Sequence, residues 1–261
     1  MTTIRNFIDD TARSVAFLSR LPMPQRHFIG YDGRLSRAVR AFPLAGVLIV
    51  LPAAALAAIL SAFHAPPMLL AFATLVLQVL LTGALHEDGL SDAADGIGGG
   101  RDRDSALAIM KDSRVGSYGV VALVLSFGLR AAAIAALAAV LTPSGLGMAL
   151  LAVAAMSRTA MVWHWSLLPP ARRDGVAASV GEPDSGATTV ALAGGIAIAA
   201  LLLLPHGTIL SFALALAAAV ITVLAFNRIA LGKIGGHTGD TIGATQQLAE
   251  MSVLFALALA L

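Results

Sequence analysis

Cysteine is absent from the 261-residue sequence, and charged and aromatic residues are scarce. Without cysteine the chain has no disulfide, no thiolate metal site and no cysteine nucleophile. Only 12% of the residues are charged, against about a quarter in a soluble domain. Apolar residues take their place, because 58% of the chain is hydrophobic and the mean hydropathy is +0.85. This composition excludes an ordinary soluble domain and predicts an integral membrane protein.

Seven apolar runs reach or approach the roughly 20 residues that an α-helix needs to cross a bilayer. Their apolar residues are continuous, whereas the strands of a membrane barrel alternate. The fold class expected is therefore all-α, a polytopic membrane protein with one membrane-embedded domain over residues 1–261. The predicted spans are 41–62, 68–86, 117–141, 145–168, 188–205, 208–227 and 240–261.

Lysine and arginine lie mainly in the first forty residues and in every second connection between the predicted spans. The connections near 63–67, 142–144 and 205–207 contain neither residue. The positive-inside rule then predicts a cytoplasmic N-terminus and cytoplasmic charged loops, which leaves the C-terminus outside after seven spans. A pI near 9.5 is also typical of nucleic-acid-binding proteins, but this alternation indicates membrane topology and no nucleic-acid partner.

The first forty residues are interpreted as a cytoplasmic segment that contains an amphipathic helix. Apolar residues recur at helical spacing over residues 4–18, while charged residues occupy the rest of the helical wheel. The apolar positions are Ile4, Phe7, Ile8, Val15 and Leu18. We expect this helix to lie on the membrane surface.

The most unusual segment, residues 86–116, begins "HEDGLSDAADGIGGG", directly after the second predicted span. On a continuation of that helix, Asp88, Asp92 and Asp95 share one face and Glu87 lies about a quarter turn away. These carboxylates repel one another and are also repelled by the negative, C-terminal end of the helix dipole. Gly96 is the residue at which the helix is expected to end. A bound cation would turn these repulsions into attractions. Carboxylate oxygens are hard ligands, which suit Mg²⁺, Mn²⁺ or Ca²⁺. A solvated helix end is the alternative.

The same segment continues through a glycine run to "KDSR". Gly98 and Gly99 permit close approach of a ligand, and Lys111 and Arg114 offer cations for a phosphate. Asp112 adds another carboxylate to the candidate metal ligands. Asp104 or Ser105 is expected to cap a short helix, while Arg101, Arg103, Asp102 and Asp104 are interpreted as having no catalytic role.

A second glycine-led motif, "KIGGHTGDTIGATQQLAE", covers residues 233–250. Gly235 and Gly236 predict a turn, and the last helix is expected to start between Thr238 and Asp240. Such a helix start presents free N–H groups to an anion such as phosphate. Asp240 adds a carboxylate, and His237 is a candidate acid–base group.

Polar residues inside the later spans should face the protein interior, because lipid cannot solvate them. Gln247 and Glu250 are expected to do so, and Arg130 and Arg158 should each meet an acid, a carbonyl or a ligand phosphate. His164, between two tryptophans, fits an interfacial aromatic belt at least as well as a functional site. The loop 170–187 is interpreted as a mobile solvated connection, with a substrate lid as the alternative.

Three segments together resemble the cobalamin synthase (adenosylcobinamide-GDP ribazoletransferase) family. They are "EDGLSDAADGIGGG", "IMKDSRVGSYG" and "IGGHTGDTIGATQQLAE", and "FLSRLPMP" and "RAFPLAGVLIV" extend the resemblance over nearly the whole chain. The resemblance implies a Mg²⁺-dependent transferase that uses one or two ions. It would join the phosphate of adenosylcobinamide-GDP to the ribose 3′-hydroxyl of α-ribazole, or of its 5′-phosphate, and release GMP. The implied location is the cytoplasmic membrane of a bacterium.

Carried onto this sequence, the family motifs assign metal, catalytic and substrate roles. The expected metal ligands are Glu87, Asp88, Asp92, Asp95, Asp112 and Asp240. The expected catalytic residues are Asp95, Asp240 and His237, with Asp95 or Asp240 as proton acceptor. The expected substrate-binding residues are Lys111, Arg114, Gly98, Gly99, Gly235, Gly236 and Thr238. The partners are a corrinoid-nucleotide donor, the α-ribazole acceptor and the lipid bilayer, and assembly as a homo-oligomer or with other enzymes of late cobalamin assembly stays open.

Two other functions fit the sequence less well. A CDP-alcohol phosphotransferase also uses membrane-embedded aspartates, but its D-G-x-x-A-R pattern fails here, since Asp92 stands where alanine would. A cation transporter would distribute acids along the depth of the bilayer, whereas most acids here gather near one end of the predicted spans.

Overall fold

A computed structural model describes residues 2–172 and 174–261. Among these residues the chain is helical and forms no strand, only an isolated bridge between Pro170 and His237. This confirms the all-α fold class. The long helices are α1 (Thr2–Leu18), α2 (Phe42–Ala62), α3 (Pro67–Thr82), α4 (Leu85–Gly99), α6 (Ser117–Val140), α7 (Pro143–Leu167), α9 (Ser185–Leu203), α10 (Ile209–Ile234) and α11 (Gly239–Ala260). Short helices are α5 (Arg103–Ile109), α8 (Val176–Ser179), η1 (Gln25–Phe28) and η2 (Ala38–Ala41).

Six of these helices, α2, α6, α7, α9, α10 and α11, are long and apolar enough to cross a membrane. Helices α3 and α4 meet the same criteria only as a pair, and the pair is bent by 90°. The seven predicted crossings are therefore reached only if this bent pair counts as one. The prediction that the acidic motif continues the second span as one helix is wrong, because Gly83 and Ala84, at φ 64° and 60°, turn the chain there.

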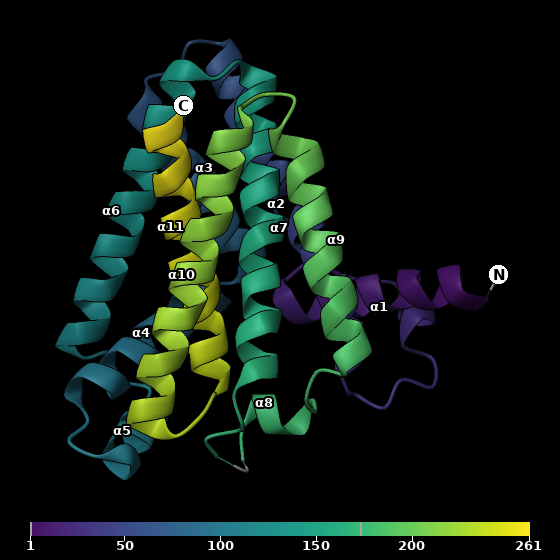
Figure 1. The fold of residues 1–261 in the computed structure, drawn as a ribbon, viewed down its shortest axis with the longest axis vertical. Coiled ribbons are helices and arrows are strands. Elements are labelled where there is room, and N and C mark those ends of the chain that lie inside the picture. Colours follow the sequence, from purple (N-terminus) through teal and green to yellow (C-terminus); the bar gives the residue numbers. More distant parts are fainter. Residues whose placement is uncertain (1, 173) are drawn as a thin grey trace.

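Helix α7 stands at the centre of the bundle and packs against α2, α9, α10 and α11 (Figure 1). It is buried along almost its whole length. Small residues permit this close packing. A Cβ added at Gly46 of α2 would lie 2.8 Å from the carbonyl oxygen of Ala154, so α2 approaches the α7 backbone directly.

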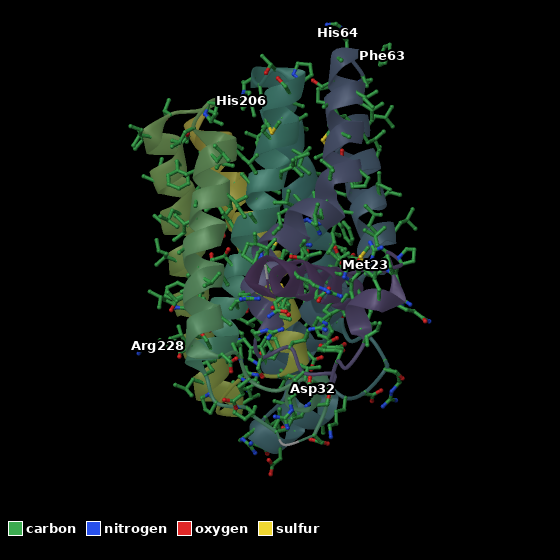
Figure 2. The ribbon with its side chains drawn as sticks, turned by 90° about the vertical axis from the view of Figure 1, so that its right-hand side faces the viewer. Met23, Asp32, Phe63, His64, His206 and Arg228 are labelled. Carbon is green, nitrogen blue, oxygen red and sulfur yellow. The ribbon has the colours of Figure 1, made fainter. Side chains whose placement is uncertain are left out.

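The two ends of the bundle differ in charge. The connections at His64 and His206 lie at one end, and Asp32 and Arg228 lie toward the other (Figure 2). Helices α4, α5 and α8 all lie at that other, charged end (Figure 1). Most of the acidic, basic and glycine-rich segments singled out in the sequence therefore meet at one end of the molecule.

Helix α1 runs across the direction of the bundle helices (Figure 1). Its outer face exposes Ile4 and Ile8, as the amphipathic pattern predicts. Its inner face packs against the bundle, where the buried carboxylate of Asp10 pairs with Arg37 at 3.1 Å and Arg40 at 2.7 Å. The helix is therefore fixed to the protein by ion pairs and not only by the apolar stripe that the sequence displays.

Candidate active site

The acidic motif forms its own helix, α4, and this changes the electrostatics expected for it. Glu87 and Asp88 lie in the first turn of α4, not at the end of the preceding helix. The helix dipole there favours negative charge, so the prediction of an unfavourable dipole at these two residues is wrong. The predicted stop at Gly96 is wrong as well, because α4 continues to Gly99.

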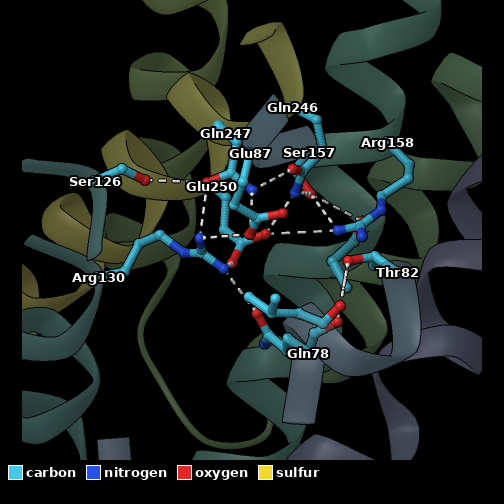
Figure 3. Close-up of polar contacts among 12 residues, drawn as sticks. Gln78, Thr82, Glu87, Ser126, Arg130, Ser157, Arg158, Gln246, Gln247 and Glu250 are labelled. Atoms are coloured by element: carbon cyan, nitrogen blue, oxygen red, sulfur yellow. Dashed lines mark hydrogen bonds and ion pairs between the residues drawn. The ribbon is translucent and has the colours of Figure 1, made fainter. Parts of the chain in front are cut away.

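Glu87 points into a buried network of charged and amide side chains (Figure 3). Arg130 contacts Glu87 at 3.0 Å and Glu250 at 3.1 Å, and Arg158 lies 3.5 Å from Glu250. Gln247 donates to Glu87 at 3.0 Å and accepts from Arg130 at 2.7 Å. We call these five residues the buried ion network. The expectation that both arginines would meet acids, and that Gln247 and Glu250 would face inward, is confirmed.

The next carboxylates of α4 belong to a different group. Asp88, Asp92 and Asp240 repel one another, and Asp240 lies in the first turn of α11. Arg172, from the loop after α7, lies 3.3 Å from Asp240 and also attracts Asp92. We call Asp88, Asp92, Asp240 and Arg172 the acid cleft. It brings together two motifs that are about 150 residues apart in the sequence.

Close backbone packing holds the two helices of the acid cleft. A Cβ added at Gly89 would lie 2.9 Å from the carbonyl oxygen of Asp240 and 3.2 Å from the Cα of Gly243. Only glycine at position 89 permits α4 and α11 to approach this closely without displacement. The glycine between Asp88 and Leu90 thus sets the distance between the carboxylates of the two helices.

The acid cleft fits a divalent cation in its ligand chemistry. Three carboxylates oppose a single guanidinium, and carboxylate oxygens are the ligands that Mg²⁺ prefers. Across the described parts of the chain, no three histidine or acidic side chains are already gathered at metal-binding distances. The cleft therefore supplies the charge and the ligand type, and the carboxylates would have to draw together around an ion.

Asp95, which also repels Asp92, is held by backbone hydrogen bonds. Its carboxylate accepts from the amides of Gly116, at 2.7 Å, and Gly119, at 2.9 Å, at the start of α6. A Cβ at either glycine would lie 2.4 Å from an Asp95 oxygen. The absence of a side chain at the two glycines of "RVGSYG" thus leaves room for the Asp95 carboxylate. This carboxylate lies at the N-terminus of α6, where the helix dipole favours negative charge.

The basic residues of "KDSR" form exposed ion pairs. Lys111 pairs with Asp174, and Arg114 pairs with Asp112 at 2.5 Å. Hydrogen bonds from Arg114 lower the pKa of Asp112 to about 2. Asp112 and Arg114 line a pocket of about 290 Å³ together with Asp95 and Gly99. The structure therefore places these residues beside Asp95, which adjoins the acid cleft through its repulsion of Asp92.

Glycine has several different functions around the site. Gly235, at φ 77°, ends α10 in the left-handed conformation, as the predicted turn requires. Gly236 instead permits contact with the loop after α7, because a Cβ there would lie 2.0 Å from the carbonyl oxygen of Pro169. Gly98 packs against the ring of Tyr118, and Gly99 is less crowded.

Helix α11 begins where the sequence predicts. Thr238 is its N-cap and accepts a hydrogen bond from the amide of Thr241 at 3.2 Å. The hydroxyl of Thr238 also donates to Asp240 at 3.2 Å. The short helix α5, in contrast, is capped by Asp102 through a capping box with Ser105, so the prediction of Asp104 or Ser105 as the cap is wrong.

His237 is buried beside the acid cleft. Within the described chain neither of its ring nitrogens has a hydrogen-bond partner. Burial lowers the pKa of His237 to about 4, so the imidazole is neutral at pH 7. A neutral imidazole can accept a proton, but it is a poor proton donor at that pH.

Several functional candidates were missed by sequence reasoning. Arg172 and Asp174 lie in the loop that the sequence indicates to be a mobile solvated connection, yet Arg172 contacts Asp240 and Asp174 pairs with Lys111. The loop 170–187 is also tied to its surroundings, since the amide of Ala171 donates to the carbonyl of His237 at 2.8 Å. In the sequence, only the polar run "PARRDG" distinguishes this loop, and no local pattern indicates which residues its side chains contact.

His164 does not lie in an interfacial belt. It is fully buried, with Nδ1 2.5 Å from Asn227 and Nε2 3.0 Å from Thr241. The interfacial interpretation is wrong because α7 is the central helix, and its tryptophan neighbours do not reveal this. Asn227 and Thr241 satisfy both ring nitrogens, so His164 fastens α7 to α10 and α11.

Comparisons with known proteins agree with this arrangement. Residues 10–258 match the family described as cobalamin-5-phosphate synthase. The chain is 63% identical to adenosylcobinamide-GDP ribazoletransferases of Sinorhizobium medicae and of Rhizobium meliloti, in both cases over the full length of the two chains. It is 42% identical to the protein of that name from Brucella anthropi, over 98% of each chain. No solved structure matches the chain. The chain belongs to the cobalamin-5-phosphate synthase family.

Proposed function

We propose that this membrane protein catalyses the final joining step of cobalamin assembly. In this reaction the ribose 3′-hydroxyl of α-ribazole, or of its 5′-phosphate, attacks the cobinamide-bearing phosphorus of adenosylcobinamide-GDP, and GMP leaves. Family membership and the names of the full-length relatives support this activity. The observation in the structure that supports it most is the acid cleft, because three carboxylates that share one arginine suit a diphosphate bound with a cation.

Asp88, Asp92 and Asp240 would hold one or two Mg²⁺ ions. Bound there, Mg²⁺ would supply charge neutralisation at the diphosphate and at the departing phosphate. Glu87, Asp95 and Asp112 are also expected as ligands, but Glu87 belongs to the buried ion network, Asp95 accepts two backbone amides, and Asp112 pairs with the exposed Arg114. We therefore assign the ion to the acid cleft and treat those three as supports of its surroundings.

Asp240 is the better of the two candidate proton acceptors. It faces the acid cleft and is held by Thr238 at 3.2 Å and by Arg172 at 3.3 Å. Asp95 instead directs both carboxylate oxygens to the backbone amides of Gly116 and Gly119. In this proposal Asp240 takes the proton of the attacking hydroxyl, and neutral His237 packs beside it without donating a proton.

Positive groups around the cleft would orient the donor. Arg172 lies at the cleft itself, and Lys111 reaches Asp174 on the same loop. Arg114 lies on the Asp95 side of the charged end. Guanidinium groups bind phosphate in a bidentate manner, so Arg172 and Arg114 would grip the diphosphate more specifically than Lys111.

We further propose a bacterial cytoplasmic membrane as the location, with the charged end in the cytoplasm. The segregation of lysine and arginine to that end supports this orientation. A reporter fused after Leu261 should then behave as extracytoplasmic, and one inserted near Gly175 as cytoplasmic. A cytoplasmic C-terminus would overturn this topology.

The activity is tested with purified protein reconstituted in lipid. GMP release from adenosylcobinamide-GDP should require both α-ribazole and Mg²⁺, and a cobalamin product should form in equal amount. Release of GMP without an acceptor would indicate a hydrolase, and no release under any condition would refute the proposed function.

A further inference from the structure

Helix α5 lies against the end of α10 at the charged end of the molecule (Figure 1). Ala106 of α5 and Met110, which follows the helix, form a small apolar cluster with two other segments. These are the end of α10 at Ile234 and the loop after α7 at Ala171, which is 3% exposed. Ala171 immediately precedes Arg172. Helix α5 therefore supports the segment that carries the arginine of the acid cleft.

Arg103, the first residue of α5, joins the same two segments by hydrogen bonds. Its Nε donates to the carbonyl oxygen of Ile234 at 3.0 Å, and its Nη2 donates to the carbonyl oxygen of Ala171. The guanidinium is a planar fork with fixed N–H directions, so one side chain can bridge two carbonyls. The Ile234 carbonyl belongs to the C-terminal end of α10, where a positive charge is favourable. Arg103 thus fastens the loop after α7 to the end of α10.

Both backbone groups of Ala171 take part in hydrogen bonds. Its carbonyl accepts from Arg103, and its amide donates to the carbonyl of His237 at 2.8 Å. The amide of His237 donates in turn to the carbonyl of Pro169 at 2.9 Å. The residue before Arg172 is therefore held from two sides, by α5 and by the segment that leads into α11.

Other contacts keep α5 in place without Arg103. The Nζ of Lys233, near the end of α10, donates to the carbonyl oxygen of Gly100 at 2.6 Å, just before α5. The apolar cluster around Ala106 and Met110 adds buried contacts to the same helix. Loss of the Arg103 side chain should therefore leave α5 docked and release only the loop after α7.

We propose that Arg103 is a positioning residue, which holds Arg172 in the acid cleft through Ala171. Arg172 lies 3.3 Å from Asp240, and this contact depends on where the backbone places residue 172. Arg103 does not touch the acid cleft itself, because its hydrogen bonds go to two carbonyls and to the exposed Asp104. The inference rests on the proposed function, in which Arg172 orients the diphosphate of the donor, and deepens it.

Turnover tests whether the reaction depends on this tie. Arg103→Met should lower kcat/KM for the corrinoid donor about 10- to 100-fold, the range expected when an orienting group moves by about 1 Å. The KM for α-ribazole should stay within about twofold of wild type, since Arg172 is assigned to the donor. An equal rise in the KM values of both substrates would indicate general damage and contradict the inference.

Two further variants separate the fork from its charge and its location. Arg103→Lys keeps the charge but cannot bridge the two carbonyls, so it should be impaired like Arg103→Met. Full activity of Arg103→Lys would show that only a positive charge is needed and would overturn the inference. Arg101→Met, at an exposed arginine two residues earlier, is the matched control and should retain wild-type activity.

Combination with Arg172→Met separates positioning from an independent effect on the reaction. If Arg103 acts through Arg172, the double variant should be as active as Arg172→Met alone, because the group that Arg103 positions is already absent. Losses that multiply in the double variant would show that Arg103 acts by another route and would overturn the inference.

Proteolysis reports the release of the loop without any turnover. Trypsin cleaves after arginine, and with no substrate present its cleavage within "ARRDG" should be about 10-fold faster in Arg103→Met than in wild type. Arg101→Met should be cleaved there at the wild-type rate, and the Tm of both variants should match that of wild type. The masses of the fragments identify the cleaved segment.

The two measurements distinguish the possible failures. Equal cleavage in all three proteins would show that Arg103 does not hold the loop. Faster cleavage of Arg103→Met with unchanged turnover would keep the tie but overturn the positioning role. Wild-type protein that releases no GMP would refute the proposed reaction, and the cleavage rates would then judge the tie by themselves.

Discussion

Glu87 and Asp88 are neighbours in the sequence, yet they belong to regions with opposite electrostatics. Glu87 lies in the buried ion network, where two arginines face two glutamates. Asp88 lies in the acid cleft, where three carboxylates face one arginine. The network is balanced in charge and fully buried, whereas the cleft carries excess negative charge and lines a pocket. The difference shows which acids are structural and which remain available to bind a ligand.

The physical reason for the difference is the direction in which α4 presents each side chain. Consecutive residues of a helix point about 100° apart, so Glu87 and Asp88 face different neighbours. Glu87 meets α6 and α11 in the interior, where a carboxylate must be paired. Asp88 meets the start of α11 at the pocket, where a mobile cation or a ligand can pair with it.

The largest effect is expected from breaking the buried ion network. Arg130→Met leaves Glu87 and Glu250 without their shared arginine in the interior. The free energy of unfolding should fall by about 3–5 kcal/mol, as is typical when one partner of a buried pair is removed. Thermal unfolding in detergent measures this effect. Arg228→Met, at an exposed arginine, is the control and should change little. Equal stability of the two variants would show that the network is not structural.

Removing one charge from the acid cleft should affect activity and spare the fold. Asp88→Asn and Asp92→Asn should each lower GMP release about 100- to 1,000-fold, the loss expected when transition-state charge stabilisation is removed. Without Mg²⁺ these variants should unfold at the same or a higher temperature, because repulsion is relieved. The wild type should be stabilised by Mg²⁺ and the variants should not.

Asp104→Asn is the matched control for these cleft variants, because Asp104 is exposed and pairs only with Arg103 among the described residues. It should retain full activity and the Mg²⁺-dependent rise in Tm. Cleft variants that behave like Asp104→Asn would mean that the acid cleft holds neither the ion nor the diphosphate.

Changing the distance between α4 and α11 tests whether the acid cleft depends on the close approach of these two helices. Gly89→Ala places a Cβ 2.9 Å from the carbonyl oxygen of Asp240, so the two helices must separate. We expect a loss of about 1–3 kcal/mol in stability, the usual cost of overpacking, together with weaker Mg²⁺-induced stabilisation. Gly128→Ala on α6 is the control, since no described atom lies within 4 Å of a Cβ there. A Gly89→Ala protein as stable as Gly128→Ala would refute the close approach.

The smallest effect concerns His237 at low pH. Its folded-state pKa of about 4 lies below the usual value of 6.5. Between these two pH values the unfolded chain therefore binds a proton at His237 and the folded chain does not. Stability should therefore fall as the pH drops from about 6.5 toward 4, by about 1 kcal/mol at pH 5.5. His237→Gln removes this contribution, so the difference in Tm between variant and wild type should narrow on acidification. A difference that does not vary with pH would contradict burial of a neutral imidazole.

Local patterns predicted the elements of this protein well. Continuous apolar runs predicted the six crossing helices within a few residues, except that α10 continues seven residues past the predicted end at 227, to Ile234. The motif "GGHTGD" predicted a start of α11 between Thr238 and Asp240, and Thr238 is its N-cap. The bend after α3 was missed because a single glycine followed by Ala84 in a left-handed conformation gives little local signal. The cap of α5 was placed two or three residues too late, because several nearby polar residues can fill that position.

The sequence by itself determined that the chain is a bundle of membrane helices, and that its acids, bases and glycines gather near one end. Hydropathy over about 20 residues and the spacing of charges suffice for this, because both are local properties. Tertiary structure alone decided the partner of each charge. Arg130 and Glu87 are 43 residues apart, and Arg172 and Asp240 are 68 apart. A buried charge is stable only beside its partner, and helix packing brings the partners together.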